Sequence, residues 1–334
     1  MGKHSKLYDV VLMRSFAIIV VVFFHCYQMM WTAHFPLTMD MYKNLYYTFV
    51  QCGIVNVAMP LFVFISGYLF EYLLQIGKYP TWCNLLRKKG LRILVPYFVF
   101  GLLFMATTGD WHPFRLLCGN YWHLWFLPML FWCFIVGYGV YNLKLKKHIE
   151  TILLGVAFLL SFAPMHLPVW MGINYVSHWF FWFYLGMFVY KNKNRLFDFI
   201  NKYRISWLLL LLYLVVNIFY PTEYGDNTTW FCVLSTAGCI IGISYLLSRI
   251  DWSRVKMASP FLKFSTYSFG IYIWHNWVAL MLISKTSQRL LGLPELAANH
   301  VILFPLIFSL ITLAISWGIS WGMMKTKVGK SLIG

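Results

Sequence analysis

The sequence is built around long apolar runs that are continuous rather than alternating. About 20 apolar residues in a helix cross the roughly 30 Å hydrocarbon core of a bilayer, whereas strands of a membrane barrel alternate polar and apolar residues. Only 11% of the 334 residues are charged, against about 25% in a typical soluble domain. We therefore expect an all-α, polytopic integral membrane protein. The runs predict about ten transmembrane helices, at residues 10–31, 48–74, 91–107, 122–143, 150–164, 174–190, 205–221, 230–247, 264–284 and 300–324.

The formal net charge of +17 is distributed unevenly between the segments that join these runs. With the N-terminus in the cytoplasm, most of the 27 Lys and Arg residues fall on the cytoplasmic side, as the positive-inside rule requires. The charge therefore predicts cytoplasmic N- and C-termini and does not indicate nucleic-acid binding. The first run is too long for a signal peptide. The longest outer loops, near 32–47, 108–121 and 285–299, are short, so we expect one transmembrane domain over 1–334 with no fused soluble domain.

The cysteines and histidines follow no ligand or disulfide pattern. Seven cysteines are scattered, mostly within the apolar runs, and none forms a CxxC pair. Ten histidines show no HExxH or comparable spacing. We expect buried free cysteines and no metal site.

Arg14 and His25 stand at the two ends of the apolar run RSFAIIVVVFFH. Eleven helical steps return to within about 20° of the starting direction, so both side chains project from one stripe, about 16 Å apart. Taken alone, Arg14 could extend to the headgroups and His25 could be a hydrogen-bonded core residue. Together they favour a functional site, because ionisable groups inside membranes usually mark substrate paths. A phosphorylated acyl carrier that enters from the cytosol fits this stripe.

Polar residues in two other segments have a structural and a functional interpretation. Ser66 and Gly67 follow Pro60 in the second run, where a kink and close helix packing are favoured over catalysis. The basic segment RKKGLR, residues 87–92, satisfies the positive-inside rule. Its cations could also bind the phosphates of a nucleotide-bearing cofactor.

Aromatic residues and a second histidine mark the remaining candidates. The segment YWHLWFLP, residues 121–128, begins the fourth run at its outer end. Its Trp and Tyr residues suit an interfacial belt and could equally stack on sugar rings. His275 lies near mid-depth of the ninth run, where a structural hydrogen bond and a polar interior site are equally open.

These motifs together resemble the family-3 membrane acyltransferases of bacteria, over nearly the whole chain. The resemblance rests on Arg14 with His25, FVFISG at 62–67, HLWFL at 123–127, YLGM at 184–187 and YSFGIYIWH at 267–275. The chain departs from the family where an Arg-x-x-Arg is common, since it reads Lys89-Gly-Leu-Arg92. Lysine keeps the charge but lacks the planar fork that arginine offers to phosphate.

The resemblance implies a multi-pass O-acyltransferase of the bacterial cytoplasmic (inner) membrane. Such proteins move an acyl group, usually acetyl, from cytosolic acyl-coenzyme A to a hydroxyl of an extracytoplasmic or lipid-linked glycan. His25 would act as general base or transient acyl carrier, and Arg14 would assist and bind the donor. Further donor-binding residues are then Lys88, Lys89, Arg92 and Ser66, and acceptor-binding residues are Tyr121, Trp122, His123, Trp125 and His275. The implied partners are acetyl-coenzyme A or another acyl-coenzyme A as donor, the glycan acceptor and the lipid bilayer, without a permanently bound cofactor; a homo-oligomer stays open.

Two other function classes remain open from the residues alone. Intramembrane Arg and His residues also suit a transporter of a glycan precursor or organic anion, with His25 and His275 as a proton relay. An inactive scaffold subunit would need neither Arg14 nor His25. Thiol release from acyl-coenzyme A distinguishes the enzyme from the transporter.

Overall fold

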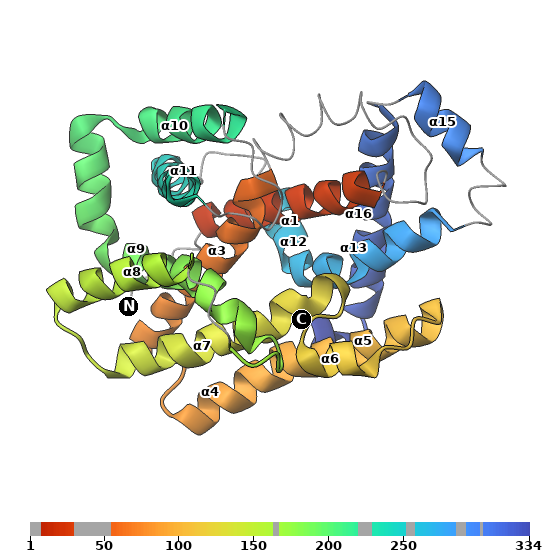
Figure 1. Cartoon of the computed structure of the whole chain (residues 1–334), viewed down its shortest axis with the longest axis horizontal. Helices are drawn as coiled ribbons and strands as arrows, with labels where there is room; N and C mark the ends of the chain where they lie inside the picture. The colour runs from red at the N-terminus through yellow and green to blue at the C-terminus, as the bar shows by residue number, and fades with distance from the viewer. Residues whose placement is uncertain are drawn as a thin grey trace. The chain divides into compact units, whose positions relative to one another are not determined.

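The computed structural model describes residues 8–29, 55–162, 167–219, 229–251, 258–284, 292–300 and 303–334. Within these ranges all regular secondary structure is helical, which confirms the all-α prediction (Figure 1). The chain divides into two compact units. Unit 1 comprises Met1–Met59 and Ser206–Gly334, and unit 2 comprises Pro60–Ile205. Unit 2 is therefore inserted into the sequence of unit 1.

Unit 1 is organised around its first helix. Helix α1 packs against α11, α12, α13 and α16, and α13 also packs along α16. A second pair in this unit is formed by α10 and α11. The described helices of unit 1 are α1 (Tyr8–Met29), η2 (Val55–Val57), α10 (Ser206–Phe219), α11 (Trp230–Ser248), α12 (Ala258–Thr266), α13 (Ser268–Leu282), α15 (Leu293–Asn299), α16 (Leu303–Met323) and α17 (Lys327–Ile333).

Unit 2 is organised around its last and longest helix, α9, which packs against α7 and α8. A π-helical turn, η3, joins α4 to α5 and also contacts α7. The helices of this unit are α3 (Ala58–Gln75, which begins at the end of unit 1), α4 (Trp82–Lys89), η3 (Gly90–Leu94), α5 (Val95–Thr108), α6 (Pro113–Cys118), η4 (Trp122–Trp125), α7 (Phe126–Asn142), α8 (Lys147–Leu160), η5 (Ile173–Tyr175) and α9 (Val176–Tyr203).

Two glycines allow α3 and α9 to cross at backbone contact. A Cβ atom added to Gly67 would lie 1.9 Å from the carbonyl oxygen of Phe183. A Cβ atom added to Gly186 would lie 2.1 Å from the carbonyl oxygen of Phe64. Small residues at such crossings let helix backbones approach closely in membranes. The structure therefore supports the packing interpretation of Gly67 and adds Gly186 as its counterpart.

Several helices are long and apolar enough to cross a membrane. Six described segments qualify, namely Tyr8–Tyr27, Ala58–Gln75, Trp82–Thr108, Pro113–Asn142, Trp230–Ser248 and Leu303–Met323, and the bent pair Ile173–Tyr203 with Ser206–Phe219 would make seven. Each of the ten expected ranges contains a helix, but α8 and α10 have only 14 residues, about 21 Å. A multi-pass membrane protein is thus supported, while ten crossings and the orientation of the termini stay predictions.

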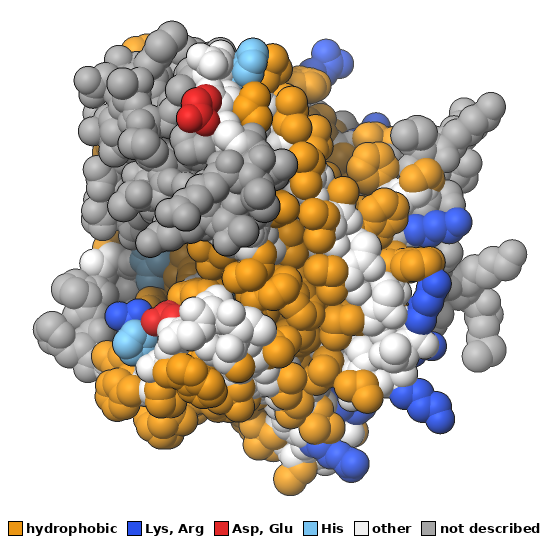
Figure 2. Space-filling model, turned by 90° about the vertical axis from the view of Figure 1, so that its right-hand side faces the viewer, with side chains coloured by type: hydrophobic (Ala, Val, Ile, Leu, Met, Phe, Trp, Pro, Cys, Tyr) orange, Lys and Arg blue, Asp and Glu red, His pale blue; other side chains and the backbone are white. Residues whose placement is uncertain are grey.

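Large apolar side chains are exposed on helices of both units. Examples are Trp207 and Leu211 on α10, Ile307 and Leu310 on α16, and Leu102 on α5. On the face drawn in Figure 2, hydrophobic side chains form a broad band over the described surface. Exposure of such an apolar surface to water is unfavourable, whereas contact with lipid tails is not.

Candidate functional site

Arg14 and His25 lie on the buried stripe of α1, as their spacing predicts. Both are half-buried. Ile18 and Val22, which lie between them on the same side of the helix, are fully buried, whereas Phe16 on the opposite side is 42% exposed. Both side chains therefore face the interior of unit 1.

His25 meets the second intramembrane histidine that the sequence singles out. The ring centroids of His25 and His275 are 5.0 Å apart, with the rings tilted by 46°. His275 is fully buried in α13, and its Nδ1 lies 2.6 Å from the carbonyl oxygen of Tyr272. A carbonyl oxygen only accepts, so Nδ1 carries the hydrogen and the neutral ring presents Nε2 as its acceptor. The pair thus offers two imidazoles that can take up and pass on a proton.

Helix α16 supplies buried polar groups next to this part of α1. The Cys26 thiol lies within hydrogen-bonding reach of the Ser309 and Thr312 hydroxyls. Ser309, Thr312, Ser316 and Ser320 are all fully buried. Their spacing of three and four residues places them on one helical face. These hydroxyls were not among the predicted site residues, although their periodicity was a usable signal.

The basic segment that resembles the donor-binding motif coincides with the π-helical turn η3. The amide of Val95 donates to the carbonyl of Gly90, five residues earlier. Pro96 follows at once; it has no N–H to donate to the Arg92 carbonyl, and its ring would clash with that carbonyl in a regular helix. A wider turn removes this clash, and such π-turns are frequent at functional sites. Proline therefore explains why the helix widens over Gly90–Leu94, a turn that includes Arg92.

The cations of this segment occupy different environments. The Lys89 ammonium lies 3.4 Å from the ring centroid of Phe134 and 5.3 and 5.5 Å from those of Tyr79 and Phe70. We call these three rings the Lys89 cage; cation–π contacts of this kind are worth about 0.5–2 kcal/mol. Burial raises the pKa of the Tyr79 hydroxyl, and the positive charge of Arg92 opposes this shift. Arg92 itself is exposed.

The other two predicted donor-binding residues make backbone hydrogen bonds. The Lys88 ammonium is exposed and donates to the Lys78 carbonyl at 3.2 Å. The Ser66 hydroxyl donates to the Phe62 carbonyl within its own helix at 2.9 Å. Arg92 is therefore the candidate whose side chain is best placed to meet a phosphate from solvent, and the binding roles of all four residues stay predictions.

The predicted acceptor residues of unit 2 form two aromatic groups. Tyr121 and Trp122 stack at 5.1 Å, with Phe104 parallel to Trp122 at 6.3 Å. Trp125 turns instead to Tyr175 and Trp179, at 5.1 and 5.5 Å. His123 is buried, with its ring 6.2 Å from Phe104.

The backbone of Trp122 is strained. Its φ angle is +44°, in a region that bulky residues rarely occupy. Such strain costs about 1–3 kcal/mol and gathers at functional sites. It favours a role for the Tyr121–Trp122 stack beyond packing.

The predicted residues thus fall into two sets. Arg14, His25 and His275 belong to unit 1, whereas the donor segment and the aromatic groups belong to unit 2. Unit 2 also contains a cavity that the sequence analysis missed, between α3, α7, α8 and α9. Its charged residues, including Glu71, Glu150 and Lys191, come from separate helices, so no local motif announces it.

Comparison with known proteins places the chain in a family. A family model for an acyltransferase domain matches residues 7–321. The chain belongs to acyltransferase family 3. The match covers both units and includes the Arg14–His25 helix and His275. No solved structure matches the chain.

Distant relatives come from staphylococci. A protein of Staphylococcus aureus (strain MRSA252), named a probable poly-beta-1,6-N-acetyl-D-glucosamine export protein, is 23% identical over 219 residues. This match covers 58% of the chain and 62% of that protein. A Staphylococcus epidermidis protein of the same name is 20% identical over 308 residues, 85% of the chain and 84% of that protein.

Proposed function

We propose that the protein is an O-acyltransferase of the bacterial cytoplasmic membrane. In this proposal it moves an acyl group, most readily acetyl, from cytosolic acyl-coenzyme A to a hydroxyl of an extracytoplasmic or lipid-linked glycan. The observation that carries the proposal is that His25, which shares the buried stripe of α1 with Arg14, contacts His275 of α13. Membership in acyltransferase family 3 supports the reaction class.

The proposed chemistry uses the two imidazoles in different roles. His25 removes the proton of the acceptor hydroxyl as the hydroxyl oxygen attacks the thioester carbonyl. The carbon–sulfur bond then breaks, and His25 gives the proton to the sulfur, so that coenzyme A leaves as the thiol. General base catalysis of this kind contributes about 10²–10⁴-fold in rate. His275, with its Nδ1 hydrogen committed to Tyr272, orients its acceptor nitrogen Nε2 and shares the proton. Arg14, on the same stripe as His25, binds an anionic part of the donor. Binding of the donor's phosphates by Arg92 and of the acceptor sugar by the aromatic residues of unit 2 are separate proposals, each made for unit 2 by itself.

The test compares His25→Ala with His148→Ala, an exposed histidine on α8. Cells that lack the gene receive the wild type or either variant, and mass spectrometry measures acyl groups on their surface glycans. We expect His25→Ala to match the deletion and His148→Ala to match the wild type, with equal amounts of protein in the membrane. Normal acylation with His25→Ala would refute the catalytic assignment.

A second candidate is export of a glycan, which the names of the staphylococcal relatives favour. In that case His25 and His275 would relay protons and no acyl group would be transferred. Purified protein in vesicles distinguishes the two candidates. Glycan movement without release of thiol from acetyl-coenzyme A supports the exporter, and thiol release that requires an acceptor glycan supports the enzyme.

A further inference from the structure

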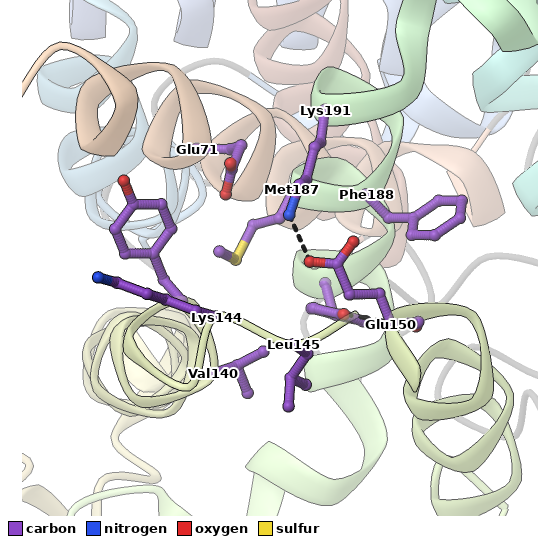
Figure 3. A pocket seen from close by; sticks show the side chains of 10 residues that line it. Glu71, Val140, Lys144, Leu145, Glu150, Met187, Phe188 and Lys191 are labelled. Atoms are coloured by element: carbon purple, nitrogen blue, oxygen red, sulfur yellow. Dashed lines mark hydrogen bonds and ion pairs between the residues drawn. The ribbon is translucent and has the colours of Figure 1, made fainter. Parts of the chain in front are cut away.

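Unit 2 contains a cavity of about 280 Å³ that the proposed reaction does not use (Figure 3). This is many times the ~10–15 Å³ that a cavity needs to hold one water molecule. Glu71 enters it from α3, Lys144 from the end of α7, Glu150 from α8 and Lys191 from α9. The cavity therefore has room for a small organic group and presents charges of both signs to it.

Glu71 in this cavity is influenced by the charge of Lys191 but does not form an ion pair with it. The ammonium of Lys191 is paired with Glu150. Glu71 is only 4% exposed, and its Oε1 accepts a hydrogen bond from Gln75 at 3.0 Å. Among the described residues, no ion pair includes Glu71. A buried carboxylate is costly unless a positive charge approaches it, so the inner end of the cavity suits a ligand cation.

The other side chains that line the cavity indicate which further groups the ligand carries. Lys144 is exposed at the rim of the cavity, just after α7 ends, and its backbone is in the left-handed region (φ +46°). Lys144 is in none of the ion pairs among the described residues. Apolar side chains, including Met187 and Leu145, line the space with these charges. A ligand with a leading cation, a short alkyl spacer and a trailing anion matches this order.

We propose that the cavity binds a phosphoethanolamine group, with its ammonium at Glu71 and its phosphate at Lys144. The ammonium carries three donors for carboxylate oxygens, and a lysine is a common point-charge partner of phosphate. The cavity lies where α3 and α7 end and α8 begins, which is the depth of lipid headgroups for helices that span a bilayer. The source is therefore a phosphatidylethanolamine headgroup, and free phosphoethanolamine shares the chemistry.

Native mass spectrometry of the purified full-length protein tests this proposal. The protein is equilibrated with equal amounts of phosphatidylethanolamine, phosphatidylcholine and phosphatidylglycerol. We expect it to retain phosphatidylethanolamine about tenfold better than the other two, because only this headgroup brings a hydrogen-bonding ammonium to Glu71. Glu71→Gln should abolish the preference, and Asp198→Asn, which removes an exposed carboxylate from α9, should keep it.

A second pair of variants covers the event that Glu71→Gln does not fold. Lys144→Gln changes an exposed side chain and should weaken retention severalfold, whereas Lys146→Gln, two residues away and also exposed, should not. Competition with soluble phosphoethanolamine identifies the source: displacement shows that the headgroup suffices, and persistence shows that the lipid chains contribute. Equal retention of the three lipids by the wild type, or an unchanged preference in both Glu71→Gln and Lys144→Gln, would overturn the proposal.

Discussion

Replacement of Gly67 by alanine should destabilise the protein, although alanine is the better helix former. The new Cβ would lie 1.9 Å from the Phe183 carbonyl oxygen, against 3.4–4 Å for an ordinary contact. The obstructing atom belongs to the backbone, so no side-chain rotation relieves it, and α3 and α9 must separate by about 1.5 Å to restore contact distance. Overpacking costs about 1–3 kcal/mol, and an overlap this severe belongs at or above the upper end. The gain in helix propensity is only about 1 kcal/mol, so a net loss of about 2 kcal/mol remains.

Thermal unfolding in detergent, followed by tryptophan fluorescence, measures this loss. For a domain of about 150 residues, 2 kcal/mol corresponds to a fall in Tm of about 4–8 °C. Gly155→Ala is the matched control, because nothing lies within 4 Å of its added Cβ; it should leave Tm unchanged or raise it. Combining Gly67→Ala with Gly186→Ala should cost less than the sum, because the helix separation that one alanine forces also makes room for the other. A Gly67→Ala protein as stable as Gly155→Ala would refute the backbone contact.

Two further predictions concern the basic segment and its surroundings. Arg92→Met should raise the KM for acyl-coenzyme A, measured by steady-state thiol release, about tenfold, the value of one charge-assisted contact. Lys89→Met should mainly change Tm, because the Lys89 ammonium lies in the Lys89 cage. A larger rise in KM for Lys89→Met than for Arg92→Met would reverse this assignment. Cys83 is exposed while the other described cysteines are buried, so an impermeant maleimide should label it in inside-out vesicles and not in intact cells, with Cys83→Ser as control. Labelling of Cys83 in intact cells would contradict the predicted orientation.

Periodicity predicted the features that lie within single helices. The apolar runs predicted the helical fold, and the eleven-residue spacing predicted that Arg14 and His25 share the buried face of α1. Both depend only on the fixed rotation per helical residue. The π-turn at Gly90–Leu94 could also have been expected, since Pro96 removes a hydrogen bond four residues back.

Features that join distant segments were beyond such an analysis. The sequence marks His25 and His275 separately, but no local rule pairs them. The Glu71 cavity and the Lys89 cage are formed by residues from several helices, and each of these residues, taken alone, indicates only a structural role. Strain at Trp122 was equally hidden, because its positive φ follows from the turn before α7 and not from the identity of the residue.

The insertion of unit 2 into unit 1 has a consequence for synthesis of the protein. His25 leaves the ribosome 250 positions before His275, which at about 5–20 residues per second is a delay of about 12–50 s. For most of that interval, until α11 is synthesised, α1, with an arginine and a histidine on one face, has none of α11, α12, α13 or α16 to cover it. We therefore expect the membrane-insertion machinery to cover this face until the last helices are synthesised. Nascent chains cut short before α11 should therefore be prime targets for membrane quality-control proteases.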